Sequence, residues 1–266
     1  MSQISFCVVA AVMLAVTGVY EVKGESSPQT GLLLKVHSSN LRGTTTNEFA
    51  VNEPVWLSVG LVNTSAAAIT VWVDGDESRG VTCRPVHGHD AKARVLRKDV
   101  PLERNFKQVV VAPGEEIPAE VLMNDFLQVH DQGAFSIDCE MGVKDGTGTP
   151  FLVKTIVPLQ FINGLATQEI STLVDQLQQQ FNSGDETMRV RVVKSCSSLP
   201  PSAVMGVLAK AISDNSERVE LAALKVLCAM TVPREEVMPL LQKAAQSEKE
   251  SVRRRAAMDM EKHEMR

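Results

Sequence analysis

The stretch LAKAISDNSERVELAALKVL, residues 208–227, has the pattern of two amphipathic helices separated by a polar turn. Apolar residues recur three and four positions apart on both sides of the turn, which is the spacing of one helix face. The first stripe consists of Val204, Val207, Leu208, Ala211 and Ile212, and the second of Val219, Ala222, Ala223, Val226, Leu227 and Met230. Each stripe is too small to stabilise a hairpin alone, so the pattern predicts that the hairpin packs against similar neighbours.

Two further stretches align with this one, beginning at Leu177 and Leu241. The steps are 31 residues (177 to 208) and 33 residues (208 to 241). Three aligned positions stay apolar in every copy: Leu177, Leu208 and Leu241; Met188, Val219 and Val252; Cys196, Leu227 and Met260. The last helix instead places Arg255, Asp259 and His263 four residues apart, which predicts a partly polar outer face at the end of an array and a pairing of Arg255 with Asp259.

These residues resemble HEAT repeats of the short bacterial type. The resemblance rests on the polar break SDNSE (residues 213–217), on the Val-Arg pairs at 190–191 and 252–253, and on Pro239 inside a first helix. It implies an α-solenoid of three helical hairpins over residues 167–266, with a protein-binding face built from the second helices. We expect exposed charged side chains on that face, with Glu220 among them. The basic candidates for partner contact are Arg189, Lys194, Arg218, Lys225, Arg253 and Arg254.

Between about residues 32 and 162 the apolar period is two. VWLSVGLVN (residues 55–63) and GAFSIDCEM (residues 133–141) each place apolar side chains on one face, and turn residues separate such runs. The pattern predicts seven to nine strands in an antiparallel β-sandwich, each strand with one buried and one solvated face. Residues 52–71 are similar to the opening of secreted bacterial immunoglobulin-like modules, and residues 131–141 to an immunoglobulin corner. In that corner Phe135 replaces Tyr, and Cys139 lies two residues late.

The predicted organisation is therefore all-β followed by all-α: an immunoglobulin-like β-sandwich over residues 25–163, then the helical array, with a short linker near Gly164. Residues 1–24 have the features of a signal peptide cleaved near Gly24, because residues 4–20 are an unbroken run of apolar and small residues. The alternative is an uncleaved membrane anchor. The sequence offers no later membrane-spanning segment, so we expect a secreted or periplasmic protein of the cell envelope.

Export would permit disulfides among the four cysteines that remain after cleavage. Cys83 and Cys139 fall in the β region and could join two strands, whereas Cys196 and Cys228 fall in the helical region. The alternative is that all four are buried free thiols.

Catalytic motifs are missing from the sequence. It contains neither a Gly-x-Ser-x-Gly nucleophile motif nor a phosphate-binding glycine loop, so we expect no enzyme and no cofactor. The net charge of −5 lacks the basic excess of a nucleic-acid binder. His87 and His89, with His130, are weak candidates for metal ligands. The ordinary interpretation of the two close histidines is a polar loop between strands.

Two functions follow from these features. The first is an exported, non-enzymatic scaffold that binds another protein through the repeats, the sandwich or both. The alternative is a metal-binding protein or metal-dependent enzyme centred on His87 and His89. A likeness of the β region to bacterial proteinase-inhibitor folds suggests a third idea, a reactive loop, but the sequence does not mark one.

Overall fold

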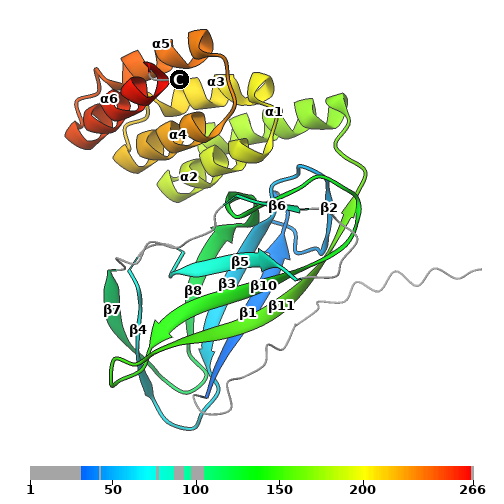
Figure 1. Cartoon of the computed structure of the whole chain (residues 1–266), viewed down its shortest axis with the longest axis vertical. Helices are drawn as coiled ribbons and strands as arrows, with labels where there is room; N and C mark the ends of the chain where they lie inside the picture. The colour runs from blue at the N-terminus through cyan, green and yellow to red at the C-terminus, as the bar shows by residue number, and fades with distance from the viewer. Residues whose placement is uncertain (1–30, 42, 76–77, 87–92, 97–104, 265–266) are drawn as a thin grey trace, which may run out of the picture.

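A computed structural model describes residues 31–41, 43–75, 78–86, 93–96 and 105–264 of the chain. Within this part, a β region with two main sheets is followed by six α-helices, as the change of period predicted. The helices lie over one end of the β region (Figure 1). The predicted signal peptide lies outside the described residues, as do His87 and His89.

The first sheet has three strands in the order β1-β3-β8, all antiparallel. The second has the order β2-β11-β10-β4-β7, with β5 also paired to β10. The strands of the two sheets are β1 (Leu32–Ser39), β3 (Trp56–Asn63) and β8 (Glu116–Leu122), then β2 (Glu48–Ala50), β11 (Pro150–Ile162), β10 (Gly133–Lys144), β4 (Ile69–Asp74), β7 (Phe106–Val111) and β5 (Val81–Pro85). A small separate pair is formed by β6 (Ala93–Val95) and β9 (Leu127–Val129).

The core of the β region lies between the two main sheets. Leu57, Val59 and Leu61 of β3 are at most 2% exposed, and Phe135 and Ile137 of β10 are equally buried. Alternate residues therefore face the core, as the period of two predicted. They form one continuous apolar cluster with residues of both sheets.

The expectation that every strand keeps one face in water is wrong for β3. Trp56 is only 2% exposed although it lies on the face opposite to Leu57. The reason is that the helical region covers this side of β3, where the Trp56 indole contacts residues of the second helix. The β region is thus enclosed at this point by a segment more than 130 residues away in the sequence.

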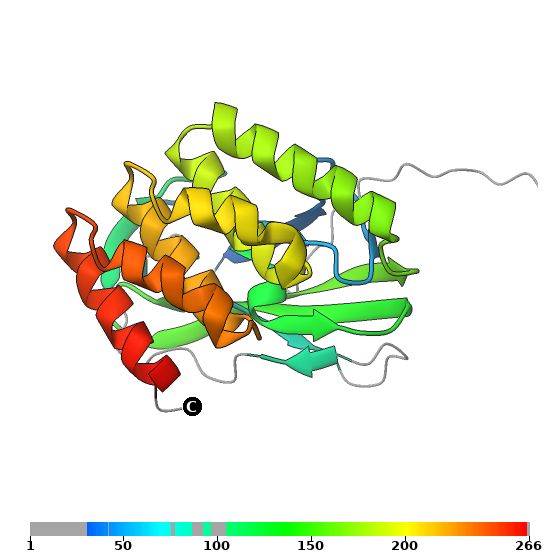
Figure 2. The same ribbon diagram turned by 90° about the horizontal axis from the view of Figure 1, so that it is seen from above.

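The helices form three hairpins, and the second helices begin at residues 186, 217 and 250, so the steps of 31 and 33 residues are confirmed. Leu177, Leu208 and Leu241 are all 0% exposed in one apolar cluster. The first helices are α1 (Thr167–Ser183), α3 (Pro201–Ala211) and α5 (Arg234–Ala244), and the second are α2 (Glu186–Ser195), α4 (Glu217–Ala229) and α6 (Glu250–Glu264). Figure 2 shows them from above as successive layers.

Local signals fix where these helices begin. The Asp185 carboxylate accepts a hydrogen bond from the Met188 backbone N–H at 2.8 Å, which caps α2. Pro201 occupies the first turn of α3, where a missing N–H costs no hydrogen bond.

Met188 is 36% exposed, unlike its equivalents Val219 and Val252, which are fully buried. Among the residues that the structure describes, no hairpin precedes α1 and α2 to cover Met188.

The predicted outward polar stripe of α6 is wrong at Asp259, which is fully buried. Arg255 Nε lies 2.6 Å from one of its carboxylate oxygens, which confirms the predicted pairing, and Lys262 Nζ lies 3.7 Å from the other. Asp259 therefore faces Cys228 of α4, and its pairing with Arg255 offsets the cost of burying a carboxylate. Burial and a hydrogen bond with Asp259 raise the pKa of the half-buried Cys228 thiol on α4 to about 12.

Candidate functional site

The β region and the helical array are joined at α2. The Trp56 indole Nε1–H donates a hydrogen bond to Ser195 Oγ at 3.0 Å, and both residues are buried. The Arg191 guanidinium lies 4.6 Å from the centre of the Trp56 ring and forms an ion pair with Glu120 of β8. We call these four side chains the α2 anchor. Because they come from β3, β8 and α2, they fix the first hairpin on the first sheet.

A second contact comes from the loop after β1. Leu41 is 4% exposed and belongs to the apolar cluster of the helices rather than to that of the sheets. Only four residues separate the end of β11 at Ile162 from the start of α1 at Thr167. The predicted short linker is present, and the two contacts pack the helical array against the β region.

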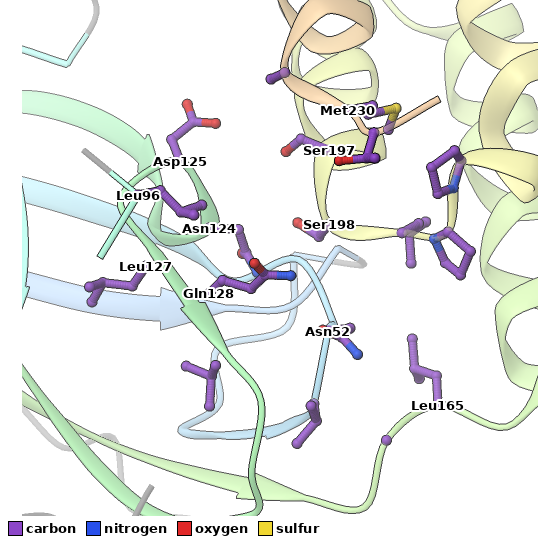
Figure 3. A pocket seen from close by; sticks show the side chains of 18 of the residues that line it. Asn52, Leu96, Asn124, Asp125, Leu127, Gln128, Leu165, Ser197, Ser198 and Met230 are labelled. Carbon is purple, nitrogen blue, oxygen red and sulfur yellow. The ribbon is translucent and has the colours of Figure 1, made fainter. Parts of the chain in front are cut away.

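Beside the α2 anchor lies a cavity of about 840 Å³, which we call the groove. Its wall in the β region includes Asn52, Asn124 and Gln128, and its wall in the helical array includes Ser198, Lys225 and Met230. Figure 3 shows side chains of both walls around the same space. The groove therefore exists only because the two regions are held together. No single motif in the sequence contains its residues.

The polar residues of the groove differ in how they are bonded. Asn124 has a structural role, because its Oδ1 accepts from the Val55 N–H at 2.8 Å and its Nδ2 donates to the Glu53 carbonyl at 3.2 Å. Ser197 Oγ donates to the Lys194 carbonyl at 2.7 Å. In contrast, Ser198 Oγ is buried and has no hydrogen-bond partner within the described residues. A buried hydroxyl without a partner costs free energy, and a rotation of the Ser198 side chain into the groove would let a bound polar group recover it.

Most of the predicted partner-binding cations are already paired within the array. Arg189 Nε lies 2.8 Å from Asp214, Arg218 Nη1 lies 2.5 Å from Glu186, and Arg254 pairs with Glu250 on its own helix. Arg253 donates to the carbonyls of Ser247 and Glu248, both at 2.8 Å. Lys194 is half-buried on α2.

The expectation that Glu220 is exposed is wrong, because it is only 4% exposed and lies 2.7 Å from Lys249 Nζ. Its carboxylate also accepts hydrogen bonds from Ser247 Oγ. Glu217 similarly accepts from Ser251 Oγ. Like the pairs of Arg189 and Arg218, these bonds join one hairpin to the next. Together they form a polar ladder at the N-terminal ends of the second helices, and the ladder holds the repeats in place.

Lys225 differs from the other predicted cations. It lies near the C-terminal end of α4, is exposed, and lines the groove. Of the predicted cations, it is the one that the structure places in a cavity shared by both regions. The sequence identified Lys225 but missed the residues of the opposite wall. Their signal was weak, because they are single polar residues: Asn52 in a turn, Asn124 in a short 3₁₀ helix and Gln128 in the three-residue strand β9.

Of the three candidate metal ligands, the described part of the structure includes His130. His130 is exposed and follows β9 directly, whereas the predictions for His87 and His89 fall outside the described residues. Among the residues that are described, no group of three or more His, Cys, Asp or Glu side chains is arranged to hold a metal ion.

Cys83 and Cys139 lie opposite each other on β5 and β10. Both are buried free thiols with their Sγ atoms 3.7 Å apart. The hydrogen bond with Cys83, together with burial, raises the pKa of the Cys139 thiol well above its usual value. Burial raises the pKa of the Cys196 thiol to about 12.

Comparisons with known proteins identify the helical part. The family model described as HEAT repeats matches residues 162–261, which include most of the six helices, so this part of the chain carries HEAT repeats. Stacked repeats of this kind present extended surfaces on which other proteins bind. The comparison with curated proteins returns no match. Within the described residues, no helix has the length and apolar character needed to cross a bilayer.

Solved structures match parts of the fold at low identity. A structural-genomics target is 10% identical, covers 52% of this chain and 91% of its own, and has a TM-score of 0.25. A FixG-related protein from Vibrio parahaemolyticus is 9% identical, with 51% and 98% covered and a TM-score of 0.23. A β-glucosidase from Listeria innocua, solved with glucose, is 12% identical, with 50% and 16% covered and a TM-score of 0.21.

Proposed function

We propose that the protein is a non-enzymatic scaffold that binds another protein in the groove between its β region and its HEAT repeats. The observation that carries the proposal is the groove itself, whose walls come from both regions and include Lys225 and the unpartnered Ser198 hydroxyl. Its volume of about 840 Å³ suits a segment of a polypeptide better than a whole folded surface. Of the other predicted cations, Arg189, Arg218, Arg253 and Arg254 already have partners within the chain.

The proposed occupant is an extended segment of the partner that carries a carboxylate. The exposed side chain of Lys225 attracts a negative charge, and the Ser198 hydroxyl forms a hydrogen bond with the peptide once its side chain rotates into the groove. Leu96 and Met230 supply apolar surface to the same cavity. This combination favours a peptide with one acidic residue flanked by apolar ones. Nucleic acid is not part of the proposal, because the groove presents no basic cluster among its described residues.

We further propose that the β region is an immunoglobulin-like sandwich. Two sheets enclose its core, and their strands are antiparallel except that β2 runs parallel to β11, which departs from the predicted all-antiparallel sandwich. The chain passes between the sheets so that β3 and β8 share one while β4, β10 and β11 share the other. Such crossing connections are typical of Greek-key sandwiches. The likeness concerns the fold and assigns no activity by itself.

Export to the cell envelope completes the proposal, with residues 1–24 removed as a signal peptide. Expression of the full chain with a C-terminal tag tests it. The mass and N-terminal sequence of the protein in the envelope or medium should show cleavage near Gly24. Recovery of the intact chain with the membranes would instead support the anchor.

The binding proposal is tested with a reversal of one charge in the groove. The tagged, exported chain is used to capture partners, and the isolated partner is then titrated against wild-type protein and Lys225→Glu. We expect Lys225→Glu to weaken binding at least about tenfold, since an attraction becomes a repulsion. Arg254→Glu is the matched control, because Arg254 is exposed on α6 and is not among the residues that line the groove.

A second variant blocks the groove without changing its charge. Gln128 is exposed on β9 and lines the groove, so Gln128→Trp fills the space with little effect on the core. We expect it to weaken binding of the same partner. Full affinity in both Lys225→Glu and Gln128→Trp would show that the partner binds elsewhere and would overturn the proposal.

A further inference from the structure

Cys83 and Cys139 occupy the middle of a short strand pairing. β5 pairs with β10 over five residue pairs, from Met141 opposite Val81 to Ile137 opposite Pro85, and the two cysteines form the third pair. Cys83 is 1% exposed and Cys139 is 0% exposed, and their Sγ atoms lie 3.7 Å apart. Each thiol is therefore the immediate neighbour of the other within the core.

We propose that these thiols are a modification site, at which a disulfide forms between neighbouring strands of one sheet when the chain folds in an oxidising compartment. The oxidant is a small-molecule or protein disulfide that reacts by exchange. One cysteine thiolate attacks it and releases a first thiol, and the other then attacks the mixed disulfide and releases a second. The two cysteines lose two electrons and two protons, and the donor disulfide becomes two thiols.

The backbone geometry allows this bond. Residues directly opposite in an antiparallel pair have Cα atoms about 4.5–5.5 Å apart, which lies within the range of about 4.4–6.8 Å found across disulfides. The sulfur atoms must approach from 3.7 Å to about 2.05 Å. Small rotations of the two side chains provide this movement, because the Cα positions need not change. An inter-sheet bond would require a different pair of strands.

Burial decides when the bond forms. Exchange needs a thiolate, and the thiolate of Cys139 is disfavoured in the folded core because its pKa is raised by the contact with Cys83 and by burial. A donor disulfide also has no access to atoms that are fully buried. The bridge therefore forms while the strands assemble, and afterwards the core protects it from reductants. The oxidation state of the pair then records the compartment in which the chain folded.

The other two cysteines in the described residues do not compete in the folded protein. Cys196 and Cys228 lie in the helical region, and the pKa of each thiol is raised to about 12. Cys196 Sγ donates to the Val192 carbonyl at 3.4 Å, and Cys228 interacts with Asp259. The structure thus favours a disulfide between Cys83 and Cys139 over the other pairings of these four cysteines.

The test uses the purified full chain and does not depend on its partner or its location. The chain is unfolded with reductant and refolded either in a glutathione redox buffer or in dithiothreitol. Free thiols are then alkylated in denaturant, and peptides are identified by mass spectrometry. We expect one linked peptide pair joining Cys83 to Cys139 after refolding in glutathione, and none in dithiothreitol. Complete alkylation of both residues under both conditions would overturn the proposal.

Two variants separate this bridge from other pairings. In the full chain, Cys7→Ala/Cys196→Ala/Cys228→Ala removes the three other thiols and should still form the bridge. Cys83→Ala should leave Cys139 fully alkylated. If Cys83→Ala fails to fold, the first variant still decides the question, because it keeps the proposed pair intact. A bridge that contains Cys196 or Cys228 in the wild type, in place of the proposed one, would also contradict the inference.

Discussion

From the α2 anchor we predict that the Arg191 side chain stabilises the contact between the β region and the helical array. Arg191 contacts the Trp56 ring at 4.6 Å and pairs with Glu120, so it links α2 to β3 and β8. The proposed change is Arg191→Met. Methionine keeps most of the aliphatic volume that packs on the indole but removes the charge and its hydrogen bonds. Any loss of stability then reports the electrostatic part of the anchor rather than a cavity.

The expected loss is about 2 kcal/mol. The contact between guanidinium and indole contributes about 1 kcal/mol at a partly buried site. The side chains of Arg191 and Glu120 are 19% and 36% exposed, so solvent screens their ion pair and limits it to about 1 kcal/mol. The hydrogen bond between Trp56 and Ser195 is unaffected by the change. The expected total loss of about 2 kcal/mol is a large fraction of the unfolding free energy of a typical domain.

Urea unfolding followed by tryptophan fluorescence measures this loss. The chain has two tryptophans, so a Trp72→Phe background leaves Trp56 as the only emitter, at the interface itself. Arg254→Met is the matched control, because Arg254 is 72% exposed in a surface pair on α6. We expect a change within about 0.5 kcal/mol for the control. If Arg191→Met costs no more than Arg254→Met, the reasoning about the anchor is wrong.

Two further outcomes follow from the packing and the turns. Leu208→Ala should lower the free energy of unfolding by about 3–4 kcal/mol, because Leu208 is fully buried at the centre of the array. Leu240→Ala should cost clearly less, because Leu240 on α5 is only half-buried. Thermal unfolding compares the two variants, and equal losses would contradict the stacked core. Hydrogen bonds from the Thr147 hydroxyl and the Thr149 N–H lower the pKa of Asp145 below its value of 3.8 in the unfolded chain. The ionised Asp145 carboxylate therefore stabilises the fold fully above pH 3.8, and this stabilisation is lost as the pH falls through the folded pKa. The stability difference between wild type and Asp145→Ala should therefore shrink as the pH is lowered from about 6 to about 2, and a difference that does not change with pH would refute the assignment.

The repeats were predictable because their signal is local. The period of the apolar residues determines which side of a helix is buried, and copies 31 and 33 residues apart repeat that pattern along the chain. The same holds for β3 and β10, whose alternate residues enter the core. These features depend on side chains within one turn or one strand, so the sequence contains all the information needed to find them.

The errors arose where distant residues meet. Asp259 looked like an outward residue because charged groups are rarely buried, but a pairing with Arg255 and contact with α4 make its burial possible. Trp56 lies on the outer face of β3, where an indole is unusual. That position was a signal that another element covers the strand. The sequence could not show which element, because α2 begins 130 residues later.

The positions of the cations suggest why the groove lies where it does. Arg189 and Arg218 lie in the first turns of their helices and join the first hairpin to the second, while Arg253, in the first turn of α6, bonds to the turn of its own hairpin. Lys225 lies near the opposite end of α4, beside the groove. The polar ladder therefore fixes the array at one end of the second helices and leaves the other end free for contact with the β region. Charge at the ladder end serves stability, and charge at the groove end remains for a partner, so reversal of Lys225 should impair binding without weakening the stack.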